Sequence, residues 1–208
     1  MELSDLTVRS FLELLGSGAP APGGGSAAAM AGSLGAALSE MVCALTVGRT
    51  QYAEYLPDAA AALEKSAALR EDFLAAMQQD ADAFNRFSAA MSAPAKTEDE
   101  KTARAAEMQQ ALTLCIAAPL RMMELSLDAI DLVDRLLGKT NAAAVSDLGV
   151  AALMLGTAAH SAWMNVLINL GSLDGAEKAA DYRAEGQALL SRTMSRSHAV
   201  CQRVCEAL

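Results

Sequence analysis

The chain has 208 residues, of which 53% are hydrophobic and only 4% aromatic, and its formal net charge is −9. This acidic balance excludes the usual nucleic-acid binder, whose affinity comes from Lys and Arg neutralising phosphates. The length suits one sizeable core and no linker-like change of composition divides it, so we expect a single domain over residues 1–208. Alanine dominates and clusters of β-branched residues between turn signals are missing, which predicts an all-α protein.

The cysteines and the N-terminus indicate the compartment. No basic region precedes an apolar run at the N-terminus, so we expect no signal peptide and a cytoplasmic protein. Cys43, Cys115, Cys201 and Cys205 form no disulfide framework, and a reducing compartment would keep them as thiols. His198 shares a helix face with Cys201 and Cys205, as metal ligands would. No further pair completes four ligands, and free cysteine is commonly a small buried hydrophobe, so we predict no metal site.

The first expected helix runs from Ser4 to Leu15 and ends at Gly16, with its apolar side formed by Leu6, Phe11, Leu12 and Leu15. A loop with two prolines and three glycines follows, from Pro20 to Gly25. Ser26 is the predicted N-cap of an Ala-rich helix that extends to about Gly48. The N–H groups at such a helix start can hold a carboxylate or a polarised carbonyl, although a simple tight connector explains the glycines equally well.

The residues after Ser26 are mostly small, which predicts a central core helix that its neighbours approach closely. Ala28, Gly32 and Gly35 are the residues on which we expect two copies of the chain to form a homodimer.

A long helix is expected from Pro57 to about Met91. Its second half carries one apolar stripe, formed by Phe73, Met77, Phe84, Phe87 and Met91. Asp80 fills the missing place in the stripe, whereas Asp82 lies on the opposite side of the helix, toward solvent. A carboxyl that faces apolar side chains should have a raised pKa, which suits a general acid or base. The alternative is an Asp80 that caps a helix or pairs with an Arg.

Three more helices complete a predicted bundle of about six, with the long helices antiparallel. Thr97 to Glu100 is typical of a capping box and opens a helix to Leu137, with a kink expected at Pro119. The others run from Ala142 to about Leu170 and from Asp174 to Leu208. Residues 148–173 carry no formal charge and could span a bilayer by length, but their His, Asn and Gly content favours a buried helix and no membrane association.

A polar seam runs along the helix from Ala142 to Leu170, formed by Asp147, Ser161, Asn165 and Asn169. Residues 147 and 165 would be about 27 Å apart on a straight helix. They can share a site only through a long ligand, a broken helix or a subunit interface. The alternative is hydrogen bonding between helices, which explains Asn165 and Asn169 better than Asp147.

Six motifs occur in order along the chain: A-P-G-G-G-S-A-A (21–28), G-R-x-Q-Y (48–52), D-A-D-A-F (80–84), A-P-L (118–120), S-D-L-G-V-A-A (146–152) and N-V-L-I-N-L (165–170). Together they resemble the cyclodeaminase/cyclohydrolase family, the C-terminal domain of formimidoyltransferase-cyclodeaminase and its free-standing bacterial relatives. The resemblance implies an all-α bundle, usually dimeric, that acts on tetrahydrofolate carrying a one-carbon unit. Members either close 5-formiminotetrahydrofolate to 5,10-methenyltetrahydrofolate with loss of ammonia, or interconvert methenyl- and formyltetrahydrofolate with water. Neither reaction requires a metal or redox cofactor.

The resemblance also implies roles for residues of this chain, because Asp80 matches the family's catalytic aspartate. The catalytic set that we expect is Asp80, Lys96 and Asp147, and the folate-binding set is Gly23, Gly24, Gly25, Ser26, Arg49, Ser146 and Asn165. Arg49 and Lys96 are the candidate cations for the negative folate tail. Relatives commonly read Pro-Lys-x-Thr where this chain has Pro94-Ala95-Lys96-Thr97, so the lysine is shifted by one residue. The alternative function is a non-catalytic, folate-binding or scaffold helical dimer.

Overall fold

The computed structural model describes residues 2–208, which form six α-helices and three short 3₁₀ turns, with no strand among them. The α-helices are α1 (Val8–Leu15), α2 (Gly24–Ala44), α3 (Leu56–Met91), α4 (Glu98–Leu136), α5 (Val145–Leu170) and α6 (Ala176–Ala207). The 3₁₀ turns are Leu3–Asp5, Thr50–Tyr55 and Ala142–Ala144. The predicted all-α bundle is therefore confirmed.

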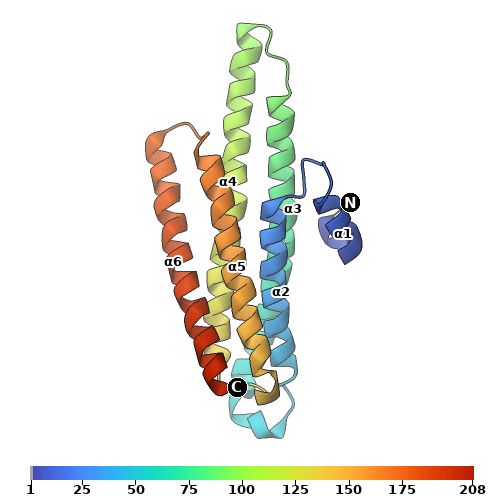
Figure 1. Cartoon of the computed structure of the whole chain (residues 1–208), viewed down its shortest axis with the longest axis vertical. Coiled ribbons are helices and arrows are strands. Elements are labelled where there is room, and N and C mark those ends of the chain that lie inside the picture. The colour runs from blue at the N-terminus through green and yellow to red at the C-terminus, as the bar shows by residue number, and fades with distance from the viewer. Residues whose placement is uncertain (1) are drawn as a thin grey trace.

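Helices α2 to α6 run alternately up and down along the long axis of the molecule (Figure 1). α2 contacts α3, α4 and α5, and α5 in turn contacts α2, α4 and α6. The far ends of α3 and α4 extend beyond the other helices as a projecting hairpin, and the short α1 lies to one side (Figure 1). The bundle thus places the start of α2 beside the middle of α3 and the end of α5.

The small residues of α2 allow this close packing within one chain. A Cβ on Gly32 would overlap the ring of Phe73 from α3, and a Cβ on Gly35 would overlap Leu155 from α5. Ala28 is 1% exposed. The prediction that α2 is a core helix is correct, but the prediction that Ala28, Gly32 and Gly35 form a dimer contact is wrong, because neighbouring helices of the same chain cover them.

Several helix boundaries differ from the expected ones. α1 begins at Val8, because the Thr7 hydroxyl accepts from the Ser10 N–H and caps it. α2 begins at Gly24 with Gly23 as its N-cap, so Ser26 lies inside the first turn and is not the cap. The capping box at Thr97 is confirmed, since its hydroxyl accepts from the Glu100 N–H and Glu100 reaches back to the cap.

Two predicted apolar helix faces are only partly buried in the structure. Leu12 on α1 is 57% exposed. In the α3 stripe Phe73 and Met77 are fully buried, whereas Phe84 and Met91 are 42% and 53% exposed. Periodicity predicts the face of a helix but not which part of that face another helix covers.

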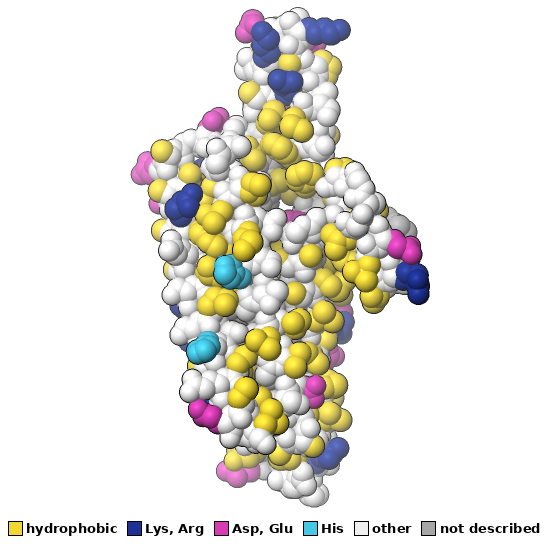
Figure 2. Space-filling view, viewed as in Figure 1, with side chains coloured by type: hydrophobic (Ala, Val, Ile, Leu, Met, Phe, Trp, Pro, Cys, Tyr) yellow, Lys and Arg dark blue, Asp and Glu magenta, His cyan; other side chains and the backbone are white. Residues whose placement is uncertain are grey.

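One side of the bundle carries a broad uncovered apolar surface, which we call the α2/α5 face. Its large exposed side chains are Leu34 and Met41 on α2, Leu45 directly after α2, and Val150, Leu153, Met164 and Ile168 on α5. Figure 2 shows hydrophobic side chains spread over this side, with Lys and Arg gathered toward the ends and edges of the molecule. Gly24–Ala44 and Ala142–Leu170 are also long and apolar enough to cross a membrane by length and composition alone, and half of each apolar window is buried in the bundle.

Candidate active site

A pocket of about 230 Å³ opens where the start of α2 meets α3, α4 and α5. The lining comes from the glycine-rich loop and these helices: Pro20, Ala21, Gly23, Gly24, Gly25, Asp80, Phe84, Cys115, Asn165, Ile168 and Asn169. Five residues predicted for the site, Gly23, Gly24, Gly25, Asp80 and Asn165, therefore meet in one place.

Asp80 lies at the N-terminus of α2, although it belongs to α3. The Ser26 hydroxyl donates to Asp80 Oδ2 at 3.3 Å. Burial raises the pKa of the Asp80 carboxyl above its ordinary value, and hydrogen bonds from the Ser26 hydroxyl and backbone N–H act in the opposite direction. Asp80 therefore both caps α2 and faces a pocket with a proton affinity suited to acid–base chemistry. Asp82 is exposed, as predicted.

Gly25 makes room for this arrangement. A Cβ on Gly25 would overlap the Asp80 carboxyl group, whereas a Cβ on Gly24 would make ordinary contact with the Asn165 amide at 3.6 Å. Gly25 thus has a specific steric reason to be glycine, and the simple-connector interpretation does not explain it.

The two asparagines of α5 present acceptors to the pocket. Asn165 Nδ2 donates to the Ser161 carbonyl at 2.9 Å. Asn169 Nδ2 donates to the carbonyls of Asn165 and Cys115, at 2.8 and 2.9 Å. These bonds use only the amide N–H groups. Neither side-chain carbonyl oxygen accepts a hydrogen bond from residues 2–208, so both can accept one from a ligand.

Cys115 and Asn169 are pocket residues that the sequence interpretation did not assign to the site. Asn169 follows Asn165 by four residues, so both lie on one face of α5, and this spacing could have assigned Asn169 to the site. Cys115 comes from α4, and nothing in its local sequence marks it. Burial, with a further contribution from the Asp80 charge, raises its pKa to about 11, so the group is a neutral thiol near neutral pH.

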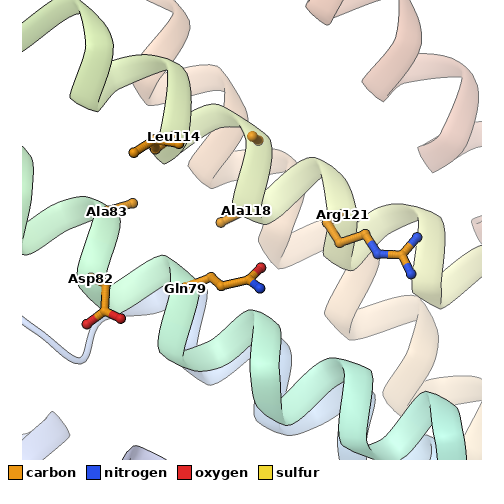
Figure 3. A pocket seen from close by; sticks show the side chains of 7 residues that line it. Gln79, Asp82, Ala83, Leu114, Ala118 and Arg121 are labelled. Carbon is orange, nitrogen blue, oxygen red and sulfur yellow. The ribbon is translucent and has the colours of Figure 1, made fainter.

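A second hollow, of about 420 Å³, lies between α3 and α4 (Figure 3). Its polar groups are Gln79, Asp82 and Arg121, above a floor of alanines and Leu114. Arg121 already pairs with Glu124 at 3.0 Å and with Asp72 at 3.5 Å. The hollow is larger than the Asp80 pocket, but its carboxylate is exposed to water and its guanidinium is already paired, so it is the weaker candidate for catalysis.

Four predicted residues lie away from the Asp80 pocket in this chain. Lys96 is exposed in the loop at the tip of the projecting hairpin, and Met91, the last residue of α3, lies eleven helical steps beyond Asp80, or about 16 Å. Arg49 follows the far end of α2 and is also exposed. Ser146 and Asp147 lie in the first turn of α5, at the opposite end of an unbroken helix from Asn165. The structure does not bring these four side chains to Asp80 within one chain.

Within residues 2–208, no group of three or more His, Cys, Asp and Glu side chains is placed to hold a metal ion. The Cys201 thiol instead donates to the Gly149 carbonyl at 3.7 Å, and Cys205 is exposed.

Together the fold and the site define a class of protein: an antiparallel helical bundle with a half-buried aspartate at a glycine-rich helix start. The family model described as formiminotransferase-cyclodeaminase matches residues 7–188. The chain belongs to this family.

Individual relatives agree with this assignment. Methenyltetrahydrofolate cyclohydrolase of Methylorubrum extorquens is 40% identical over 185 residues, which cover 89% of each chain. Formimidoyltransferase-cyclodeaminase of Sus scrofa is 32% identical over 197 residues, which cover 95% of this chain but only 36% of the longer pig protein. The crystal structure of formiminotetrahydrofolate cyclodeaminase from Thermotoga maritima shares the fold, with a TM-score of 0.83, 23% identity, and coverage of 100% of this chain and 98% of that one.

Proposed function

We propose that this protein is an enzyme of folate one-carbon metabolism, a 5,10-methenyltetrahydrofolate cyclohydrolase with Asp80 as its general acid/base. The observation that carries the proposal is the position of the Asp80 carboxyl, half-buried at the start of α2 and open to a pocket. The Methylorubrum extorquens cyclohydrolase supports this reaction, because the match covers nearly the whole of both chains.

The pocket chemistry suits a tetrahydropterin. The edge of the pterin ring carries several N–H donors, and the side-chain carbonyl oxygens of Asn165 and Asn169 can accept hydrogen bonds from them. The free N–H groups in the first turn of α2, at Gly24 and Gly25, are donors for the pterin carbonyl. Phe84 and Ile168 add apolar surface at the mouth.

For the hydrolysis, the electrophile is the carbon between N5 and N10 of the methenyl group, which carries a delocalised positive charge. The Asp80 carboxylate accepts a proton from a water molecule as its oxygen bonds to this carbon. The bond from this carbon to N5 then breaks as the protonated carboxyl returns the proton to N5. The hydroxyl group on the carbon releases its remaining proton to solvent, which leaves formyl on N10. One carboxyl group therefore serves both proton transfers, and no cofactor is needed.

Cyclodeamination of 5-formiminotetrahydrofolate is the second candidate, supported by the relative from Sus scrofa. Here the formimino group reacts in its protonated form (–CH=NH2⁺): N10 bonds to its carbon and loses a proton to Asp80, and the imino nitrogen becomes an amino group. The carbon–nitrogen bond to this amino group breaks, and the departing nitrogen takes the proton and leaves as ammonia.

Purified protein should be assayed with both substrates, following the near-ultraviolet absorbance of the methenyl compound against the uncatalysed rate. Faster loss of methenyltetrahydrofolate supports the cyclohydrolase, and formation of it from the formimino compound supports the cyclodeaminase. If neither rate changes, calorimetry with 5-formyltetrahydrofolate separates a folate-binding scaffold from a protein that does not bind folate.

We further propose that the chain acts as one domain and as a cytoplasmic homodimer. The α2/α5 face supports the dimer, because exposed apolar patches of this extent commonly mark protein interfaces. Free thiols at all four cysteines are what a reducing compartment maintains.

A further inference from the structure

We infer that Pro119 is a positioning residue of the Asp80 pocket, because it frees a backbone carbonyl of α4 that anchors the amide of Asn169. Pro119 belongs to the A-P-L motif (118–120), and no residue of this motif lines the pocket. The proline therefore acts through Asn169 and not by contact with a ligand. The inference rests on the proposed function, in which the Asn169 oxygen accepts a hydrogen bond from the substrate.

Pro119 removes one hydrogen bond from the interior of α4. The helix runs through Pro119 from Glu98 to Leu136, and the proline is buried. Proline has no backbone N–H, so the carbonyl four residues earlier, at Cys115, lacks the donor that a regular helix would give it. A carbonyl in the protein interior needs another donor in place of the lost one. A proline inside a helix is therefore tolerated only where its surroundings compensate for it.

Asn169 of α5 supplies the replacement donor. Its Nδ2 donates to the Cys115 carbonyl at 2.9 Å and to the Asn165 carbonyl at 2.8 Å. An amide group has two N–H hydrogens, and these two bonds use both of them. The amide cannot turn over without setting its oxygen against two carbonyl oxygens. The nitrogen is therefore fixed toward the two carbonyls, and Oδ1 is left for a ligand.

Asn165 shows what a pocket asparagine has without such an anchor. Its Nδ2 donates to the Ser161 carbonyl, which belongs to the same helix. Asn169 makes the equivalent bond to Asn165, and within residues 2–208 the bond to Cys115 is the one that its side chain makes to another helix. Asn169 also lies in the last turn of α5, which ends at Leu170, and the ends of helices fray. An amide in this turn gains most from an anchor outside its own helix.

The anchor lies in the wall of the pocket where α4 meets α5. Cys115 and Asn169 both line the pocket together with Asp80. The bond between α4 and α5 therefore holds the Asn169 oxygen at a fixed place relative to the Asp80 carboxyl. A substrate N–H that bonds this oxygen is oriented toward the carboxyl, and the amide loses little further freedom on binding because it is already ordered.

Two substitutions of Pro119 test the inference. Pro119→Ala and Pro119→Val both restore a backbone N–H that competes with Asn169 for the Cys115 carbonyl, but valine keeps more of the buried volume of the ring. Helical circular dichroism should be kept, since both residues continue a helix better than proline. In both variants the KM for methenyltetrahydrofolate should rise by about 3–10-fold with little change in kcat. A rise in only one variant would indicate packing around the ring and would overturn the inference.

A double-mutant cycle shows whether Pro119 acts through Asn169. Asn169→Ala alone should raise KM by at least as much as Pro119→Ala does. When Pro119→Ala is added to Asn169→Ala, KM should not rise further, because the amide that it would release is absent. If the two effects multiply instead, Pro119 acts on binding by another route and the inference is wrong.

Gln109→Ala is the matched control, because Gln109 of α4 also holds the chain at the end of α5. Its side chain donates to the Ser172 carbonyl at 3.0 Å and accepts from the Asp174 N–H at 2.9 Å, and it does not line the pocket. Gln109→Ala should lower the melting temperature and leave KM unchanged. An equal rise in KM would show that any loosening at the end of α5 weakens binding, which would contradict the specific role of Pro119.

Nuclear magnetic resonance of the ligand-free protein tests the anchor apart from activity. The side-chain N–H signals of Asn169, assigned by their loss in Asn169→Ala, should exchange slowly with water in the wild type because both hydrogens are bonded. In Pro119→Ala they should exchange faster and shift toward the positions of exposed amides. Unchanged signals would overturn the inference even in an active enzyme. Changed signals in a protein that neither turns over methenyltetrahydrofolate nor binds 5-formyltetrahydrofolate would support the anchor and refute the proposed function.

Discussion

The Asp80 carboxyl occupies the space in which a side chain on Gly25 would lie. Gly25→Ala should therefore push the carboxyl out of the α2 N-terminus and lower both activity and melting temperature. Gly18→Ala is the control, because a Cβ at Gly18 has no heavy atom within 4 Å. We expect Gly18→Ala to match the wild type in both measurements, and equal effects of the two substitutions would contradict the steric argument.

Asp80→Asn keeps the size of the side chain and removes its ability to exchange a proton. We expect turnover to fall by about 10²–10⁴-fold with little change in KM. Asp82→Asn is the matched control on the solvent side of α3 and should leave the rate unchanged. Equal losses from the two substitutions would show that the catalytic assignment is wrong.

The stability of Asp80→Asn should depend on pH in a defined direction. Burial raises the pKa of Asp80, so the folded state binds this proton more tightly than the unfolded state. The contribution of Asp80 to stability is therefore fully present below the unfolded pKa and is lost as the pH rises through the folded pKa. The melting temperature of Asp80→Asn should equal or exceed that of the wild type at pH 7, with a smaller difference in acid. A less stable variant at pH 7 would indicate a structural, charge-paired Asp80.

Ser26→Ala removes a hydrogen bond that lowers the pKa of Asp80. The pKa should rise further, so the limb of the pH profile of kcat/KM on which the rate increases with pH should move to higher pH. Ser39→Ala, on the same helix, removes only a bond to the Gly35 carbonyl and should leave the profile in place. An unchanged profile in Ser26→Ala would mean that another group controls this limb.

Gly32→Ala tests the close packing of α2 against α3 within one chain. The added methyl group would overlap the Phe73 ring, so unfolding should become easier by about 1–3 kcal/mol with an unchanged mass by light scattering. A changed mass with unchanged stability would instead place Gly32 at a contact between subunits.

The helices and the position of Asp80 on its helix were predictable because each depends on residues close together in the sequence. The capping residues at Thr97 lie within one turn of each other, and the 3.6-residue period separates Asp80 from Asp82 on α3. Which element covers a helix face depends on residues far away in the sequence. Phe84 has the same periodic position as Phe73, yet it lies at the pocket mouth because α2 begins only at Gly24.

The residues predicted for the site also fall into two groups, those that lie near Asp80 in one chain and those that do not. Gly25 and Asn165 were placed with Asp80 because their motifs lie at the α2 start and the α5 end, which one bundle brings together. Arg49 and Asp147 lie at the other end, and no pattern in one chain states how two copies meet. Ser26 was assigned as a cap by residue type, but Gly23 precedes it in the extended conformation that a cap requires, and the Ser26 hydroxyl is directed to Asp80.

The projecting hairpin of α3 and α4 has a consequence for local opening of the molecule (Figure 1). From Phe84 to Gln110 the only buried residue is Ala90, and ion pairs such as that between Arg86 and Glu107 span the two arms. Few apolar contacts hold these turns, so they can unwind while the bundle below stays folded. Amide hydrogens in the hairpin should exchange with deuterium earlier than those around Ile116 and Met122, and Asp80 marks the boundary between the two regimes.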